Sequence, residues 1–127
     1  MKQSYRDLEV YKQSFQLFLR THRFTVDLPK FEKYELGSQL RRSADSVNSN
    51  IVEGYGRKRY KREFIRFLTF SLASNDETVN HLKKISHLYP NLAPEAIELH
   101  DAYDELGKRL NRFIMYVCQH WKTPTST

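Results

Sequence analysis

The densest group of side chains able to do chemistry lies within residues 55–66. Residues 57–66 hold six basic side chains against one acid, Glu63, so this window carries a net charge of +5, whereas the whole chain carries +6. Cations bind phosphate oxygens, and tyrosine rings stack on unpaired bases. An ordinary solvated turn is the alternative interpretation. The pattern predicts a nucleic-acid surface made of Arg57, Lys58, Arg59, Lys61, Arg62 and Arg66 together with Tyr55 and Tyr60.

Other basic residues could extend this surface. Arg41 and Arg42 lie earlier in the chain, and they could instead pair with acids of the fold such as Glu53, Asp76 or Glu77. Contacts of this kind are made mainly to the phosphate backbone, so they do not distinguish RNA from DNA or select a sequence. Weaker candidates for the same surface are Lys108, Arg109 and Arg112.

Catalytic and metal-binding patterns are missing from the sequence. The five histidines are dispersed, and only Glu77 and His81 stand at a spacing that shares a helix face. There is no Glu-x-x-His pair for a di-iron site, no phosphate-binding glycine loop and no nucleophile elbow. We therefore expect a protein that is not an enzyme and that has no catalytic residue, metal or cofactor.

A helical ribonuclease is the enzyme class that deserves separate consideration, because such bundles use an Arg followed four to six residues later by a His. Arg112 and His120 are too far apart for this pattern, and Lys83 with His87 begins from Lys. Nuclease activity is therefore the less favoured alternative.

Composition indicates one helical domain that spans residues 1–127. The chain is 39% hydrophobic and 28% charged, and it holds only four Gly and four Pro, which suits long helices better than a many-turned sheet. The lone Cys118 cannot form an internal disulfide. No run of about 18 apolar residues and no leader pattern after Met1 is visible. We therefore expect a cytoplasmic protein with no membrane partner.

Four segments repeat apolar residues at three- and four-residue spacing, and they must position the basic window. Short links between helices of this length place neighbours antiparallel. The sequence thus predicts an all-α, up-down-up-down four-helix bundle followed by a disordered tail at 122–127. The expected helices cover about residues 7–26, 32–55, 61–88 and 94–121.

The first two helices have distinct faces. In the first, Asp7 is the expected N-cap and the expected buried stripe is Leu8, Tyr11, Phe15, Phe18 and Leu19. In the second, small and polar residues occupy the middle, so packing rather than propensity must hold the helix. Its small residues allow a close helix approach, and Gly54 with Gly56 marks its end.

The third helix is apolar over more than one stripe. Phe67 and Phe70 fall on the flank of its main apolar face. A wide stripe in a small bundle is one interpretation, and self-association through Phe67 and Phe70 is the other. Oligomerisation would repeat the basic window and raise avidity.

Several ordered motifs resemble one known family. They are YRDLEVY at residues 5–11, QLRRS at 39–43, SNIVEGYGR at 49–57 and EFIRFL at 63–68. The chain resembles the bacterial four-helix-bundle proteins of the 23S rRNA intervening sequence family over about residues 5–121. That family includes the accessory variability determinant of diversity-generating retroelements, and the motifs do not choose between these branches.

The resemblance implies a non-catalytic bundle that assembles as a homopentameric barrel with basic surfaces. In the retroelement branch it implies association with a reverse transcriptase and nucleic acid during mutagenic cDNA synthesis; the alternative is a protein associated with rRNA or ribosomes. Asn50 and Glu53 fall within the family motif and are expected to make interhelical or intersubunit hydrogen bonds. Relatives often have Pro where this chain has Asn48, so a kink in the second helix is less expected.

Overall fold

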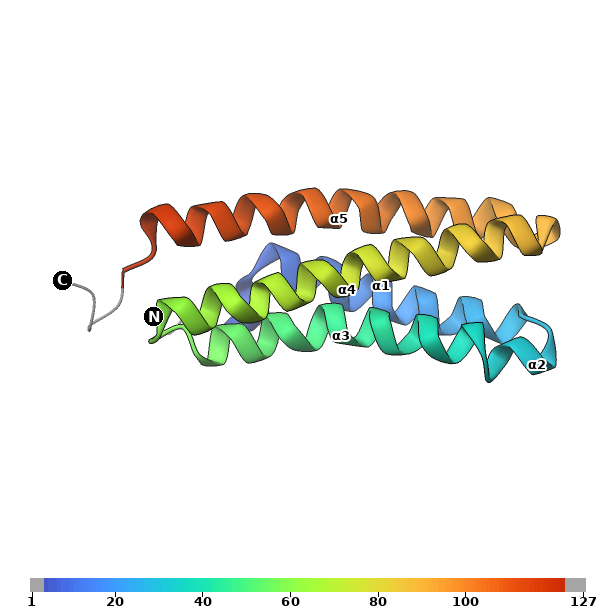
Figure 1. Ribbon diagram of the computed structural model, residues 1–127, viewed down its shortest axis with the longest axis horizontal. Coiled ribbons are helices and arrows are strands. Elements are labelled where there is room, and N and C mark those ends of the chain that lie inside the picture. Colours follow the sequence, from blue (N-terminus) through green and yellow to red (C-terminus); the bar gives the residue numbers. More distant parts are fainter. Residues whose placement is uncertain (1–3, 123–127) are drawn as a thin grey trace.

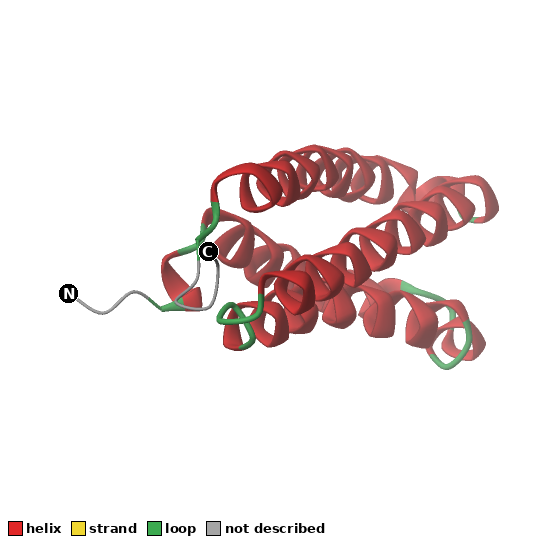
Figure 2. Cartoon of the chain, turned by 60° about the vertical axis from the view of Figure 1, so that its left-hand side comes forward, coloured by secondary structure: helices red, strands yellow, loops and turns green. Residues whose placement is uncertain are grey.

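The computed structural model describes residues 4–122, and the elements in that range are helical (Figures 1 and 2). Four long helices run along the longest axis of the molecule, joined by short connections. The long helices are α1 (Glu9–Phe24), α3 (Leu36–Gly56), α4 (Lys61–Leu88) and α5 (Ala93–His120); the short elements are α2 (Lys30–Lys33) and the 3-10 turns η1 (Tyr5–Asp7), η2 (Thr25–Asp27) and η3 (Pro90–Leu92).

The topology confirms the predicted antiparallel four-helix fold. Helix α1 packs against α3 and α5, and α4 packs against α3 and α5. The α3–α4 connection lies at the same end of the bundle as the last turn of α5, and α2 lies at the opposite end (Figure 1). Assembly of copies into a pentamer stays an expectation.

Helix α4 spans 61–88, as predicted, and α5 is shifted by one residue from the predicted range, with Pro94 in its first turn. The core between them contains Phe64, Leu68 and Tyr103, each fully buried. Of the predicted tail, only Lys122 lies within the described residues.

The predicted buried stripe of the first helix was only partly right, because Leu8, Tyr11 and Phe18 are half-buried against the core but its other two members are exposed. Phe15 and Leu19 are 39% and 38% exposed. The face that α1 buries consists of Val10, Ser14, Leu17, Thr21 and Phe24. Two of these are hydroxyl residues that pair with backbone carbonyls, so they are buried without an unsatisfied group: the Oγ of Ser14 donates to the Tyr11 oxygen, and the Oγ1 of Thr21 donates to the Leu17 oxygen.

The first predicted helix differs from the structure at both ends and the second differs at its start, whereas the second ends at Gly56, within one residue of the prediction. Asp7 belongs to η1, where it forms a capping box with Ser4, and α1 begins after Leu8 without a side-chain cap. The second predicted helix is two helices, because the chain leaves helical geometry at Glu35 between α2 and α3.

Polar residues in the middle of α3 form bonds with α4, which explains how a helix of low propensity is held. The Oγ atoms of Ser46 and Ser74 are 2.8 Å apart, and the Oγ of Ser71 donates to the Val47 oxygen at 2.6 Å. Asn50 donates to the oxygens of Ser46 in its own helix, so the described contacts do not include the interhelical bond expected of it. Helix α3 is continuous through Asn48, which donates to Ser14 of α1.

Candidate nucleic-acid interface

The basic window forms the turn between α3 and α4. Helix α3 ends at Gly56, the amide of Lys58 donates to the Tyr55 oxygen, and the amide of Tyr60 donates to the Arg57 oxygen at 2.8 Å. Helix α4 begins directly afterwards at Lys61. The turn therefore places six consecutive positions, 57–62, at one end of the bundle.

Trp121 holds this turn from the last helix. Its Nε1 donates to the Lys58 carbonyl oxygen at 3.2 Å, and its ring packs edge-on against Phe64 with centroids 5.0 Å apart. Sequence reasoning missed this contact, because the two residues are far apart in the chain and no local pattern connects them. The backbone of the basic turn is thus held by the residue that directly follows α5.

Tyr55 does not lie where a base could reach it. The side chain is only 6% exposed, and its ring packs edge-on against Phe64 and Trp121. Tyr60, in contrast, is 57% exposed beside Arg59, whose guanidinium carbon is 6.0 Å from the ring centroid. Of the two predicted stacking residues, Tyr60 has the surface for it, and Tyr55 belongs to the core.

Arg57 and Arg66 are occupied by contacts within the chain. The Nε of Arg57 lies 2.9 Å from the Glu53 carboxylate, and a second guanidinium nitrogen lies 3.4 Å from Glu63. Arg66 lies 3.5 Å from the same Glu63. Both guanidinium groups also cover the Phe67 ring, at 4.7 and 5.8 Å from its centroid. Their charges are therefore partly neutralised.

Four cations of the window remain without an acidic partner among residues 4–122. Arg59 and Arg62 are exposed, and Lys58 and Lys61 are half-buried. The ammonium of Lys58 lies 3.8 Å from the centre of the Tyr55 ring, which orients it without neutralising it. We call this set the open cations: Lys58, Arg59, Lys61 and Arg62.

Two of the open cations stand at an electrostatically unfavourable place. Lys61 and Arg62 occupy the first turn of α4, where the positive end of the helix dipole favours acids. Tyr60, the N-cap residue, makes no side-chain cap hydrogen bond. Glu63 is the acid of the same first turn, and the amides and cations of this helix end suit an additional anion.

Arg41 and Arg42 lie far from the turn. They are at the other end of α3, roughly 24 Å from Arg57 along the helix axis. Arg41 donates to the Thr25 hydroxyl and the Lys33 carbonyl oxygen, both at 2.9 Å, whereas Arg42 is exposed. Arg41 therefore joins the start of α3 to the preceding connection, and neither residue pairs with Glu53, Asp76 or Glu77 in the described structure.

Phe67 and Phe70 form an edge-on pair on α4 with centroids 5.4 Å apart. Phe70 is 41% exposed, and Phe67 is half-buried beneath the arginines described above. Arg66 also lies 5.3 Å from the Phe70 centroid. The predicted self-association surface is therefore continuous with the basic turn.

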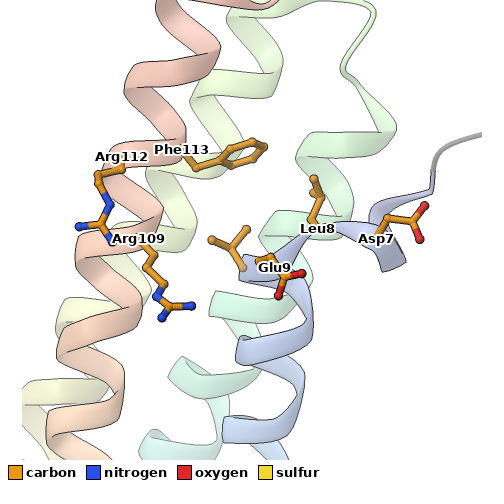
Figure 3. Close-up of a pocket in the computed structure, with 7 residues that line it drawn as sticks. Asp7, Leu8, Glu9, Arg109, Arg112 and Phe113 are labelled. Carbon is orange, nitrogen blue, oxygen red and sulfur yellow. The ribbon is translucent and has the colours of Figure 1, made fainter.

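A pocket of about 520 Å³ lies between η1–α1 and α5. Figure 3 shows Arg109 and Arg112 projecting from α5 on one side and Asp7 and Glu9 on the other. The Asp7 carboxylate accepts the Ser4 amide at 3.0 Å, and Arg109 lies 3.7 Å from Glu105. The pocket is lined by charges of both signs, and some of them already have partners within the chain. It therefore does not suit a phosphate.

The structure does not bring the two nuclease candidates together. His87 lies in the last turn of α4 and His120 in the last turn of α5, and these two helices are antiparallel. Within the described range, no three side chains from His, Cys, Asp and Glu gather in a way that could hold a metal. No helix in residues 4–122 is long and apolar enough to cross a membrane.

Groups with shifted pKa values lie away from the turn. Burial lowers the pKa of His81, helped by Lys84 and opposed by Glu77. Burial also raises the pKa of Tyr103 above its ordinary value, although its hydroxyl is 2.8 Å from Thr21. These two groups belong to the packed core, so their pKa shifts reflect burial and not chemistry at the turn.

Comparison with known proteins identifies a family. The family model described as 23S rRNA-intervening sequence protein matches residues 6–112, which includes α1, α3, α4 and most of α5. The match ends before Trp121. None of the curated proteins matches the chain.

Proposed function

Because the chain belongs to the 23S rRNA-intervening sequence protein family, a family not known for enzymatic activity, we propose that it is a non-catalytic accessory protein that binds nucleic acid. The observation that carries this proposal is the set of open cations beside the exposed Tyr60. Four cations that have no acidic partner in the described part of the chain suit a polyphosphate chain, and one exposed ring suits an unpaired base.

The position of the cations supports the same proposal. Lys61 and Arg62 at the start of α4 cost stability through the helix dipole. An anion bound at this helix end offsets the unfavourable interaction of the two cations with the helix dipole. It also accepts hydrogen bonds from the backbone amides of the first turn. Trp121 fixes the turn before any ligand arrives, which lowers the entropy cost of binding.

Self-association is the second part of the proposal. Phe70 is exposed next to Phe67, and this pair adjoins the basic turn, so a ring of copies would repeat the open cations around it. The family resemblance suggests five copies. Sedimentation equilibrium of Phe70→Ser tests the surface, with Phe15→Ser on α1 as a matched exposed control. We expect only Phe70→Ser to reduce the mass; a reduction with Phe15→Ser alone would place the interface on α1.

Two cellular roles remain for a protein of this kind. The favoured one is that of an accessory factor for a retroelement reverse transcriptase, which would then be its protein partner. The second is association with rRNA or ribosomes, which the family description, 23S rRNA-intervening sequence protein, supports. The gene neighbourhood separates them: a reverse transcriptase gene with template and variable repeats supports the first, and an insertion within an rRNA gene supports the second.

Binding itself is tested by fluorescence anisotropy with labelled single-stranded RNA and single-stranded DNA. Replacing the four open cations by Ala should weaken binding at least about tenfold, which corresponds to about 1.4 kcal/mol. Arg57→Ala is the matched control, because this arginine already pairs with Glu53 and Glu63. Equal affinities of the parent and the fourfold variant would show that the turn is merely solvated.

A further inference from the structure

A self-complementary charge pattern lies along the exposed side of α5. We call it the α5 outer face, and in chain order it runs from an apolar residue through acids and then bases to a second apolar residue. The charged members are exposed, and the apolar residues at its ends, Ile97 and Met115, are 50% and 51% exposed. The α5 outer face consists of Ile97, Asp101, Asp104, Glu105, Lys108, Arg109, Arg112 and Met115.

The helix dipole does not explain this order. Its effect is confined to the first and last turns, whereas the charges from Asp101 to Arg112 occupy the middle of the 28-residue helix. Pairing within the chain explains it only in part. Among residues 4–122, Glu105 of this face pairs with Arg109 at 3.7 Å, and Asp101 lies within hydrogen-bond distance of its neighbour His100.

The pattern becomes complementary when the helix is reversed. We infer that a second copy of this chain docks its α5 outer face antiparallel on the first, about a two-fold axis level with Leu106 and Gly107. Asp101 then faces the partner's Arg112, and Glu105 faces the partner's Arg109. Asp104 faces the partner's Lys108, and Ile97 faces the partner's Met115. A contact of this type uses the same patch on both copies.

Helix geometry places Asp101 at the same height as Arg112 of the partner subunit. With a rise of 1.5 Å per residue, Asp101 and Arg112 lie about 8 Å on either side of the two-fold axis. In the antiparallel copy the two residues therefore exchange heights. At 3.6 residues per turn, both also lie within about 10° of the centre line of the face. This pair is therefore the most direct contact in the predicted interface.

The interface is expected to be weak and sensitive to salt. Exposed ion pairs contribute about 0–1 kcal/mol each and are screened by salt. The apolar contacts of Ile97 and Met115 lie at its two ends and add burial that salt does not weaken. Association should therefore be clearest at low ionic strength.

The contact has a consequence for nucleic-acid binding. It leaves Phe67 and Phe70 on α4 and the open cations uncovered, because it uses α5 alone. Since the basic turn lies beside the end of α5, an antiparallel pair carries its two basic turns at opposite ends. Such a pair can bridge two nucleic-acid segments. This consequence rests on the proposed function, whereas the contact itself does not.

Charge reversal with mixing tests the contact. Asp101→Arg and Arg112→Asp each place like charges at the central pair, so sedimentation equilibrium at low ionic strength should show half the mass of the parent for either variant alone. An equimolar mixture of the two should recover the parental mass, because the two like-charged pairs of each single-variant contact are then replaced by two oppositely charged pairs. The double variant Asp101→Arg/Arg112→Asp should also recover it.

Controls distinguish this result from misfolding and from nonspecific charge effects. Asp45→Arg on α3 makes the same charge change on another exposed position and should leave the mass unchanged. Circular dichroism of each single variant should match that of the parent. An unchanged mass of either single variant, or a folded mixture that fails to recover the parental mass, would overturn the inference.

Discussion

The two neighbouring arginines on α3 show how the partners of a side chain decide its role. Arg41 donates to the Thr25 hydroxyl and to the Lys33 carbonyl, whereas Arg42 is exposed. We expect Arg41→Ala to lower the free energy of unfolding by about 2 kcal/mol, since charged hydrogen bonds are lost in a half-buried place. Arg42→Ala should change it by less than about 0.5 kcal/mol. Urea unfolding measures both, and equal effects would contradict this assignment.

His81 makes stability depend on pH. Its side chain is 5% exposed, and its Nδ1 has no hydrogen-bond partner in the described part of the chain. Burial and Lys84 lower its pKa below 6.5, so the unfolded chain takes up the proton at a higher pH than the folded chain does. The stability of the fold is therefore fully present above pH 6.5 and falls as the pH drops through the lowered pKa.

Replacing the imidazole tests this linkage. We expect the free energy of unfolding of the parent to fall more between about pH 7 and about pH 5 than that of His81→Leu, which has no group to protonate there. Comparing the two proteins by urea unfolding at each pH cancels the contribution of the carboxylates. Parallel pH profiles would show that His81 is not the group responsible.

At the scale of the element, α1 shows why apolar periodicity alone misplaced a buried face. Ser14 and Thr21 are buried because their hydroxyls bond to carbonyls of the same helix, and Phe15 and Leu19 are left at the surface. Counting apolar residues cannot detect this, since it treats every hydroxyl as exposed. Helix α4 also buries polar residues such as Ser71 and Asn75, but its ends were predicted because the apolar repeat extends from Phe64 to Ile85 and Pro90 follows it.

Two leucines of α1 test the corrected face. Leu17 is 5% exposed and Leu19 is 38% exposed. We expect Leu17→Ala to lower the free energy of unfolding by about 2–4 kcal/mol through loss of burial and creation of a cavity. Leu19→Ala should cost about 1 kcal/mol or less. Urea unfolding measures both losses. A larger loss for Leu19→Ala than for Leu17→Ala would contradict the assignment of the buried face.

Two glycines of α3 test how closely it approaches α4. A Cβ at Gly54 would lie 3.1 Å from the Phe67 Cβ and 3.3 Å from the Phe64 carbonyl oxygen, whereas a Cβ at Gly56 would meet nothing within 4 Å. Neither glycine has a positive φ. We expect Gly54→Ala to destabilise by about 1–3 kcal/mol and Gly56→Ala to be neutral or mildly stabilising. If thermal unfolding showed Gly56→Ala to be less stable than Gly54→Ala, the close approach of α3 to α4 at Gly54 would be excluded.

At the scale of the whole molecule, local sequence patterns were enough to predict the architecture, but they were not enough to predict the contacts of the site. Helix periodicity with short links is enough for an antiparallel bundle, and the charge run placed the basic turn at one end of it. The contacts that sort the basic residues are non-local: Trp121 holds Lys58, and Glu63 and Phe67 engage Arg57. Burial of Tyr55 likewise depends on Phe64 and Trp121, which no local pattern brings together.

The central claim is that the open cations bind nucleic acid through phosphates. The most direct measurement is the slope of the logarithm of the association constant against the logarithm of salt concentration, for single-stranded RNA with the parent and the fourfold alanine variant. Each phosphate neutralised contributes about 0.7 to this slope, so the variant should lose up to about 3 in slope per chain engaged. Identical slopes for the two proteins would contradict the claim, because the open cations would then release no counterions on binding.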